Sequence, residues 1–136
     1  MSDALSHEQI EGMLQVAKQA SANAYCKYSE FPVGAALLLR SGTLVPGCNV
    51  ENVSYGLTNC AERTAVFSAV AQGYSKDDML GLLFYMPGQR LYSPCGACRQ
   101  VIGEFLDASA EVVATNDTEA VKRWRVADLL PDAFEF

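Results

Sequence analysis

Three cysteines have the type and spacing of a metal site. Cys60 and the pair Cys95 and Cys98 each stand where a helix is expected to begin, in the segments Cys60-Ala61-Glu62 and Pro94-Cys95-Gly96-Ala97-Cys98. The dipole and free N–H groups of a helix N-terminus stabilise a thiolate, which is the form of cysteine that binds zinc. Cys95 and Cys98 are one helical turn apart and share a face. If the two helix starts converge, three thiolates can bind one Zn²⁺.

A zinc site with three thiolates keeps one coordination position for water. Structural zinc sites are usually closed by four protein ligands, whereas catalytic sites have three protein ligands and an open position. Glu62 follows Cys60 by two residues, so its side chain can point toward the metal without binding it. A carboxylate in that position can carry protons to and from the reacting groups. The alternative is that Asn59-x-x-Glu62 is an ordinary capping box. The open position and the carboxylate favour hydrolysis over a purely structural site.

The charge of the predicted site requires a cation beside it. Three thiolates outweigh one Zn²⁺, which makes bound water less acidic than neutral ligands would. Arg63 lies at the same helix start as Glu62, where the helix dipole disfavours a cation, so we expect it to hydrogen-bond the thiolates. Arg99 is a second candidate, and a surface or interface position is the alternative for Arg63. The single histidine, His7, is expected in solvent, so the ligands must be sulfur.

Composition and charge limit the partners of the chain. It has 136 residues, 50% of them hydrophobic, and a net charge of −6, which suits one domain over residues 1–136 and disfavours nucleic acid or membrane as a partner. No signal peptide or membrane-spanning run is evident, so a cytoplasmic location is expected. Five cysteines make a disulfide framework unexpected. Cys26 and Cys48 lie outside the motif and are expected to be small buried side chains, with reactive thiols as the alternative.

Hydrophobic periodicity predicts alternating helices and strands around these residues. Ser6 and Gln9 form a capping-box pattern before the first helix. The segment 59–72 is apolar around most of its circumference, which predicts a helix buried in the core. The predicted elements are a helix over 7–24, a hairpin of strands over 33–39 and 43–45, a helix over 59–72, a strand over 82–86, a helix from about 94, a strand over 111–115, a possible edge strand over 120–126 and a helical turn over 127–130. This alternation indicates an α/β layer fold.

Five segments in order along nearly the whole chain carry a family resemblance. They are Phe31-Pro32-Val33-Gly34-Ala35-Ala36, Asn49-Val50-Glu51-Asn52, Tyr55-Gly56-Leu57-Thr58-Asn59-Cys60-Ala61-Glu62-Arg63-Thr64-Ala65, Ser93-Pro94-Cys95-Gly96-Ala97-Cys98-Arg99-Gln100 and Leu129-Leu130-Pro131-Asp132-Ala133-Phe134. Together they resemble the small, homotetrameric cytidine deaminases whose zinc ligands are all cysteine. The resemblance implies a three-layer α/β/α fold with a mixed sheet of roughly five strands.

The resemblance also implies roles for individual residues. It implies that Cys60, Cys95 and Cys98 bind one Zn²⁺ per subunit. It implies that Glu62 is the proton shuttle of the reaction. The substrate contacts that it implies are Asn49 and Glu51 at the ribose 3′-hydroxyl, Phe31 against the ring, and the backbone N–H of Ala61 at the pyrimidine edge.

The implied assembly and reaction rest on the same resemblance. Phe134 is implied to reach the pocket of a neighbouring subunit in a homotetramer, and Tyr55 to lie at an interface or in the pocket, with plain packing as its alternative. The implied reaction is hydrolytic deamination of cytidine and 2′-deoxycytidine in pyrimidine salvage, by attack of zinc-bound hydroxide at C4 with Glu62 moving the protons. The alternatives are a related aminopyrimidine nucleoside such as blasticidin S as substrate, and a non-catalytic binding module that zinc stabilises.

Overall fold

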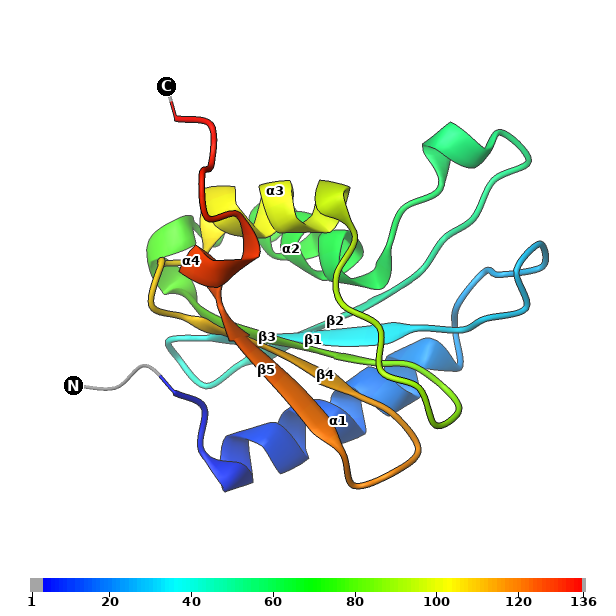
Figure 1. Cartoon of the computed structure of the whole chain (residues 1–136), viewed down its shortest axis with the longest axis horizontal. Helices are drawn as coiled ribbons and strands as arrows, with labels where there is room; N and C mark the ends of the chain where they lie inside the picture. Colours follow the sequence, from blue (N-terminus) through cyan, green and yellow to red (C-terminus); the bar gives the residue numbers. More distant parts are fainter. Residues whose placement is uncertain (1–3, 136) are drawn as a thin grey trace.

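The computed structural model describes residues 4–135 (Figure 1). Its helices are α1 His7–Ser21, α2 Ala61–Ala71, α3 Gly96–Phe105 and the short α4 Val126–Leu129. Its strands are β1 Gly34–Leu39, β2 Leu44–Cys48, β3 Met79–Tyr85, β4 Glu111–Thr115 and β5 Val121–Arg125. Two single-turn 3₁₀ helices, η1 Tyr55–Leu57 and η2 Lys76–Asp78, precede α2 and β3.

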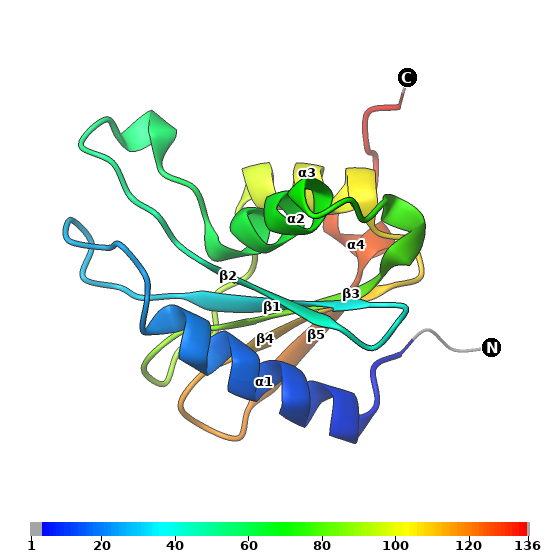
Figure 2. The same cartoon turned by 180° about the vertical axis from the view of Figure 1, so that it is seen from behind.

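The strands form one mixed sheet in the order β2-β1-β3-β4-β5. β3 and β4 run parallel, with α3 as their crossover, and the other neighbouring pairs are antiparallel. Helix α1 covers one face of the sheet, and α2 and α3 cover the other (Figure 1, Figure 2). The predicted three-layer α/β/α fold with a mixed sheet of five strands is therefore confirmed.

The inner strands are apolar on both sides because the sheet is covered on both faces. All residues of β1 are buried. Leu37 belongs to the core cluster under α2 and α3, and its neighbour Leu38 belongs to the cluster under α1. Full burial of one leucine side chain contributes about 2 kcal/mol to stability. Burial on both faces explains why this strand is a continuous apolar run in the sequence.

Two glycines let the helices approach the sheet closely at one end. A side chain at Gly34 would collide with α1, because its Cβ would lie 1.8 Å from the carbonyl oxygen of Ala17. A side chain at Gly47 would collide with the start of α2, with the carbonyl oxygen of Ala61 at 2.4 Å. The close approach at Gly47 places the N-terminus of α2 directly on β2.

Helix α1 begins as predicted and ends earlier. The capping box is present: the Gln9 backbone N–H donates to Ser6 Oγ at 3.1 Å, and the Ser6 N–H donates to Gln9 Oε1 at 2.9 Å. The helix ends at Ser21, before the predicted end at residue 24. The chain leaves the helix there because Tyr25 pairs with the segment after β2, where its N–H donates to the carbonyl oxygen of Asn49 at 3.0 Å.

The two edge strands of the sheet occur as predicted, with different bounds. β2 continues to Cys48, beyond the predicted end at Val45. Pro46 lies inside it, which is tolerated because β2 is an edge strand. β5 forms the opposite edge, as predicted for residues 120–126, and its residues are mostly exposed.

Helix α2 is less completely buried than its composition predicts. Its buried face holds Ala61, Glu62, Ala65, Val66 and Ala69. The prediction of a helix buried in the core is wrong for Phe67 and Val70, which are 46% and 43% exposed. These two side chains are apolar but face away from the sheet. Among the described helices, none is long and apolar enough to cross a membrane.

Candidate active site

Three cysteine side chains from the starts of two helices meet at one end of the sheet. Cys60 is the N-cap of α2, Cys95 is the N-cap of α3, and Cys98 lies in the first turn of α3. Their sulfur atoms all lie within 4.8 Å of one another, and no other potential metal-ligand cluster occurs within residues 4–135. The Cys98 backbone N–H donates to Cys95 Sγ at 3.4 Å. The two helix starts thus converge as the sequence predicts.

The spacing of the sulfur atoms fits tetrahedral zinc. Two thiolates at the usual Zn–S length of about 2.3 Å lie about 3.8 Å apart in a tetrahedral site. The Sγ atoms of Cys60 and Cys95 are 3.7 Å apart. Cys98 is buried and Cys95 is exposed, so the cluster is closed toward the core and open toward solvent. The three side chains fit one zinc ion that keeps an open coordination position.

Arg63 lies beside the cysteine cluster. Its Nη2 group donates to Cys60 Sγ at 3.3 Å. The hydrogen bond with Cys98 is the main cause that lowers the pKa of Cys60 to about 5, and Arg63 acts in the same direction against the effect of burial. Burial alone lowers the pKa of Arg63, but the hydrogen bonds to Cys60 and Cys98 outweigh it and raise that pKa. A guanidinium that stays charged here offsets the negative charge of the thiolates.

Arg99, the second candidate for this role, has other partners. Its Nε group donates to the carbonyl oxygen of Pro94 at 2.8 Å, and its Nη1 group donates to the carbonyl oxygen of Leu129 at 3.0 Å. Both acceptors are backbone groups, one before α3 and one at the end of α4. Arg99 therefore joins the loop that carries Cys95 to the C-terminal helix.

Glu62 is almost fully buried beside the cysteines, with 5% of its surface exposed. Burial raises the pKa of Glu62 to about 7, and the nearby charge of Cys60 acts in the same direction. A carboxyl group that titrates near neutrality can both accept and release a proton. Cys60, not Asn59, is the N-cap of α2, no side chain caps the helix, and Asn59 donates to Thr64 Oγ1 at 3.0 Å. The capping-box alternative for Asn59 and Glu62 is therefore wrong.

A pocket of about 290 Å³ opens beside the cluster, with Cys60 and Cys95 in its wall. The predicted site residues that line it are Phe31, Asn49, Glu51, Ala61 and Glu62. They come from segments far apart in the chain: the loop before β1, the segment after β2 and the first turn of α2. The end of β3 and the loop before α3 complete the wall.

Asn49 and Glu51 are held by the segment that carries Phe31. Asn49 Oδ1 accepts from the backbone N–H of Val33 at 2.9 Å, and its Nδ2 donates to the carbonyl oxygen of Phe31 at 2.9 Å. The Glu51 carboxylate accepts from the hydroxyl and from the backbone N–H of Ser29. Hydrogen bonding, chiefly from the Ser29 hydroxyl, lowers the pKa of Glu51. The protein itself therefore fixes the orientation of both polar side chains.

Sequence reasoning missed several residues of the pocket wall, among them Tyr92 and Ser29. The ring of Tyr92 meets the ring of Phe31 edge to face, with centroids 6.0 Å apart and planes at 87°. The Tyr92 backbone N–H donates to Met86 Sδ at 3.2 Å, which fixes the loop. Neither residue belongs to a periodic pattern. For Tyr92, the only available signal was its place directly before the motif that begins at Ser93.

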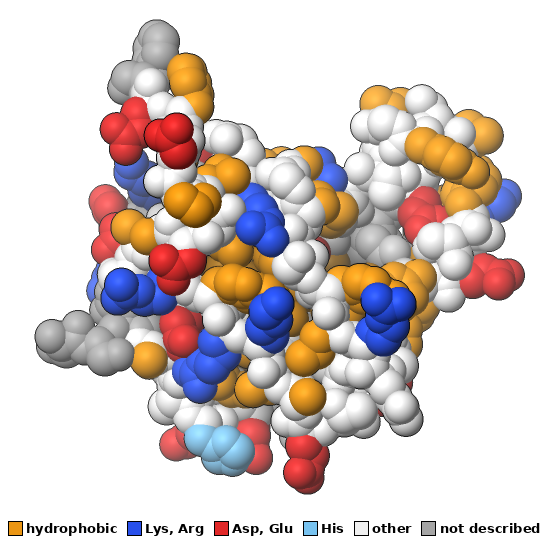
Figure 3. All heavy atoms as spheres, viewed as in Figure 1, with side chains coloured by type: hydrophobic (Ala, Val, Ile, Leu, Met, Phe, Trp, Pro, Cys, Tyr) orange, Lys and Arg blue, Asp and Glu red, His pale blue; other side chains and the backbone are white. Residues whose placement is uncertain are grey.

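Phe134 and Tyr55 do not reach this pocket. Phe134, in the C-terminal tail, is 78% exposed, and Tyr55, in η1, is 77% exposed. The tail and the segment 50–58 project on either side of α2 and α3 (Figure 1). Hydrophobic side chains gather on the projecting segment, which also carries the exposed Val53 and Leu57 (Figure 3).

Cys26 and Cys48 lie outside the metal cluster. Both are free thiols and partly buried. Burial raises the pKa of Cys48, and the charge of Cys26 acts in the same direction. A raised pKa disfavours the thiolate, so Cys48 is not activated for reaction.

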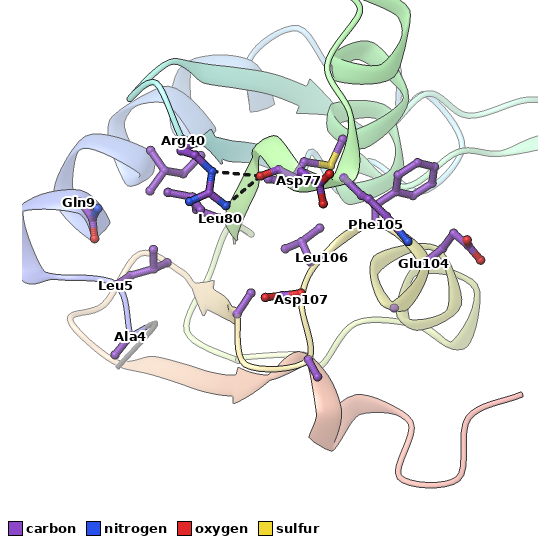
Figure 4. A pocket seen from close by; sticks show the side chains of 16 residues that line it. Ala4, Leu5, Gln9, Arg40, Asp77, Leu80, Glu104, Phe105, Leu106 and Asp107 are labelled. Atoms are coloured by element: carbon purple, nitrogen blue, oxygen red, sulfur yellow. Dashed lines mark hydrogen bonds between the residues drawn. The ribbon is translucent and has the colours of Figure 1, made fainter. Parts of the chain in front are cut away.

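A larger hollow, of about 520 Å³, lies at the opposite end of the strands (Figure 4). Its wall includes Arg40 after β1, Leu80 in β3, Leu5 before α1 and the end of α3. Arg40 is already engaged, because its Nε and Nη2 groups donate to the backbone oxygen of Asp77 at 3.1 and 2.8 Å. Within the described part of the chain, the one potential metal-ligand cluster is at the other end. Volume alone does not identify the candidate site.

Known proteins match the chain over most of its length. The family model of the cytidine and deoxycytidylate deaminase zinc-binding region matches residues 7–115. A cytidine deaminase of Sporosarcina psychrophila is 48% identical over 125 residues, which cover 92% of this chain and 90% of that protein. A cytidine deaminase of Halalkalibacterium halodurans is 44% identical over 122 residues, which cover 90% of this chain and 91% of that protein.

Solved structures match the fold. The crystal structure of the cytidine deaminase from Burkholderia pseudomallei has a TM-score of 0.88 and 46% identity, covering 96% of this chain and 100% of that chain. The crystal structure of the cytidine deaminase from Mycobacterium tuberculosis has a TM-score of 0.78 and 41% identity, and the match covers 93% of this chain and 98% of that chain. The segment matched by the family model contains the three clustered cysteines and Glu62. The chain therefore belongs to the cytidine and deoxycytidylate deaminase family.

Proposed function

We propose that the protein catalyses the zinc-dependent hydrolysis of cytidine and 2′-deoxycytidine to the uridine nucleosides and ammonia. The observation that carries this proposal is that thiols spaced for zinc and a buried carboxyl group, Glu62, share one pocket. The family relatives named cytidine deaminase support it. A non-catalytic module would need a fourth protein ligand for zinc, and the described residues offer three in the cluster.

Each residue in and around the cysteine cluster would have a separate role in hydrolysis. Zinc held by Cys60, Cys95 and Cys98 would supply a Lewis acid that makes water a nucleophile near neutral pH. As the oxygen of the attacking water bonds C4, Glu62 would take the protons of that water and pass one to ring nitrogen N3 and one to the amino group, whose bond to C4 then breaks to release ammonia. The burial of Glu62 keeps these proton transfers apart from bulk water. Arg63 would favour the thiolate form of Cys60.

The polar groups at the other side of the pocket suit a nucleoside. Asn49 and Glu51 would bind the ribose 3′-hydroxyl, because the Asn49 amide has a second N–H and the Glu51 carboxylate can accept a further hydrogen bond. Phe31 would pack against the pyrimidine ring. The backbone N–H of Ala61, at the start of α2, would face the edge of the base. These contacts favour a nucleoside over the free base.

Ammonia release from zinc-quantified protein tests the proposal. Cytidine and 2′-deoxycytidine should both be deaminated, and free cytosine should react at least about 100-fold less efficiently because the sugar contacts are lost. Blasticidin S, in the same assay, separates cytidine from the alternative substrate class. Failure to release ammonia from either cytidine nucleoside, with a full complement of zinc, would contradict the proposal.

We also propose that the active form is a homotetramer in which Phe134 of one subunit completes the pocket of a neighbour. Large exposed hydrophobic side chains on a single subunit mark an interface when they gather in patches. On this subunit they include Val53, Tyr55 and Leu57 on the projecting segment, Phe67 and Val70 on α2, and Phe134 on the tail. Analytical ultracentrifugation should give four times the mass of one chain, and a stable monomer with full activity would contradict the assembly.

Co-expression of two impaired variants tests whether Phe134 acts between subunits. Glu62→Gln removes the proton carrier of a site, and Phe134→Ala removes the contact that the neighbour supplies. In mixed tetramers, some sites combine an intact Glu62 with an intact Phe134 from the neighbour, so activity should exceed the mean of the two variants alone. An activity equal to that mean would place Phe134 outside the neighbouring pocket.

We further propose that residues 1–136 act as one domain in the cytoplasm. A single sheet supports both core clusters of the described residues. The five free cysteines suit a reducing compartment. A single cooperative unfolding transition tests the domain assignment, and cell fractionation tests the location.

A further inference from the structure

The loop between α1 and β1 is tied to the segment that carries Asn49 and Glu51. The Tyr25 N–H donates to the carbonyl oxygen of Asn49 at 3.0 Å, and the Glu51 N–H donates to the carbonyl oxygen of Tyr25 at 2.8 Å. The two segments lie side by side where they leave the sheet (Figure 1, Figure 2). This pairing places the tip of the loop, at Tyr28 and Ser29, against the side chain of Glu51.

The loop tip uses most of the hydrogen-bonding capacity of the Glu51 carboxylate. Oε1 accepts from the backbone N–H of Tyr28 at 3.0 Å and from that of Ser29 at 3.1 Å. Oε2 accepts from the Ser29 hydroxyl. A carboxylate has about four acceptor positions, so these bonds leave about one, on Oε2. Glu51 can therefore receive a single ligand hydroxyl in a defined direction.

The Ser29 hydroxyl joins Glu51 to Phe31. While it donates to Glu51 Oε2, its oxygen accepts from the backbone N–H of Phe31 at 3.1 Å. Glu30, between them, has a φ of 57°, in the left-handed region, and its N–H donates to the carbonyl oxygen of Cys26 at 2.7 Å. This tight turn brings Phe31 back toward the pocket that Glu51 also lines. One hydroxyl thus links the side chain proposed for the sugar to the residue proposed for the base.

We propose that Ser29 is a positioning residue for nucleoside binding, whose hydroxyl holds the Glu51 carboxylate and the Phe31 backbone in one arrangement. The inference rests on the proposed function, in which Glu51 binds the 3′-hydroxyl of the sugar. Without the Ser29 hydroxyl, Glu51 loses the bond that orients Oε2, the oxygen with the free acceptor position. The sugar contact should weaken, while the groups at the cysteine cluster stay in place.

The test compares cytidine with 3′-deoxycytidine, which lacks the hydroxyl that Glu51 is proposed to bind. Ser29→Ala should raise KM for cytidine about tenfold, the effect of losing one charge-assisted hydrogen bond, with kcat within about twofold. KM for 3′-deoxycytidine should change less than about threefold, because that substrate lacks the sugar contact and the Asn49 amide still holds the Phe31 carbonyl oxygen. The ratio of the two kcat/KM values, the 3′-hydroxyl preference, should therefore fall.

Two further variants separate positioning from a general effect on the loop. Ser29→Thr keeps a hydroxyl at the same place and should restore most of the preference that Ser29→Ala loses. Ser41→Ala removes an exposed hydroxyl from the β1–β2 hairpin, where it bonds Thr43, and should leave the preference unchanged. A loss of preference in Ser29→Thr equal to that in Ser29→Ala would overturn the role of the hydroxyl.

Glu51→Gln distinguishes failure of this inference from failure of the proposed function. If Glu51→Gln lowers the 3′-hydroxyl preference and Ser29→Ala does not, the positioning role is overturned and the sugar contact stands. If Glu51→Gln leaves the preference unchanged, the proposed sugar contact is wrong and the positioning role falls with it. The 3′-hydroxyl preference of the double variant should match that of Glu51→Gln within about twofold, because Ser29 acts on this preference through Glu51. An additive further loss would contradict that dependence.

Discussion

The two ends of the sheet differ in what their polar side chains do. At the end with the smaller pocket, unlike groups converge on one space: thiols, the buried Glu62 and the oriented Glu51. At the end with the larger hollow, Arg40 bonds the Asp77 backbone, and the described residues form no metal-ligand cluster there. The larger hollow has more volume, but no cluster of potential metal ligands among the described residues lines it. The position of the candidate site therefore follows from side chains that converge, and not from the volume of a hollow.

Cys98→Ala should have the largest effect of the changes considered. Cys98 is the buried member of the cluster, and its loss leaves two thiols, which is too few to hold a catalytic zinc. We expect zinc content near zero by elemental analysis and activity lower by at least about 10⁴-fold. Cys48→Ala, a change outside the cluster, is the matched control and should keep both. If Cys98→Ala keeps its zinc, the assignment of the ligands is wrong.

Arg63→Gln should weaken the site without removing it. The variant loses the cation that bonds Cys60 Sγ, and groups that support metal ligands are typically worth about 10–100-fold in metal affinity or activity. The rate of zinc release to a chelator should rise accordingly. Arg40→Gln is the matched control, since Arg40 bonds a backbone carbonyl at the other end of the sheet and not sulfur. Equal zinc release from the two variants would mean that Arg63 does not support the thiolates.

Glu111→Gln, at the other end of the sheet, should affect stability and spare activity. Glu111 Oε1 accepts from the Leu5 N–H at 2.6 Å, and its carboxylate also pairs with Arg123. Loss of the charge should cost about 1–3 kcal/mol of the free energy of unfolding at pH 7. Denaturant unfolding measures this cost, and kcat/KM for cytidine should stay within about twofold.

The same variant should show the pH dependence of that contribution. Burial raises the pKa of Glu111, but the bonds from Arg123 and Leu5 outweigh burial, and the net pKa lies below its ordinary value of 4.5. The carboxylate therefore stabilises the fold above that ordinary value, and the contribution is lost as the pH falls through the native pKa. The difference in unfolding free energy between wild type and Glu111→Gln should shrink below about pH 4.5. A difference that stays constant to pH 3 would contradict the assignment.

Arg40→Ala should have the smallest effect, although it alters the larger hollow. Its side chain is exposed and bonds one backbone oxygen, so its removal should cost no more than about 1 kcal/mol of stability. Zinc content and kcat/KM should match those of the wild type. A strong loss of activity would show that the larger hollow takes part in the reaction and would break the contrast between the two ends.

Much of the fold could be predicted from the sequence because local rules agreed with tertiary structure. The capping box at Ser6, the apolar run of β1 and the strand over 111–115 follow from side-chain pattern alone. The ends of α1 and β2 could not be predicted so well, because they depend on the pairing of Tyr25 with the backbone around Asn49. The exposure of Phe67 also escaped prediction, since an apolar residue on a helix does not reveal whether the sheet or another surface covers it.

The candidate site was predictable where chemistry fixes residue type and spacing. Cysteines that open two helices, with a glutamate in the first turn of one of them, are typical of a catalytic zinc site, and the structure brings these side chains together. The contributions of Ser29 and Tyr92 depend on loop geometry, on the turn at Glu30 and on contacts between distant segments. No periodicity in the sequence marks such contacts.

Glu62→Gln tests most directly whether the buried carboxyl group carries the protons of the reaction, through zinc content and kcat measured on the same sample. The substitution keeps the size of the side chain and removes its ability to carry a proton. Zinc should stay at about one ion per subunit while kcat for cytidine falls by at least about 10³-fold. A variant that keeps its zinc and deaminates cytidine within tenfold of the wild-type rate would show that Glu62 is not the proton carrier.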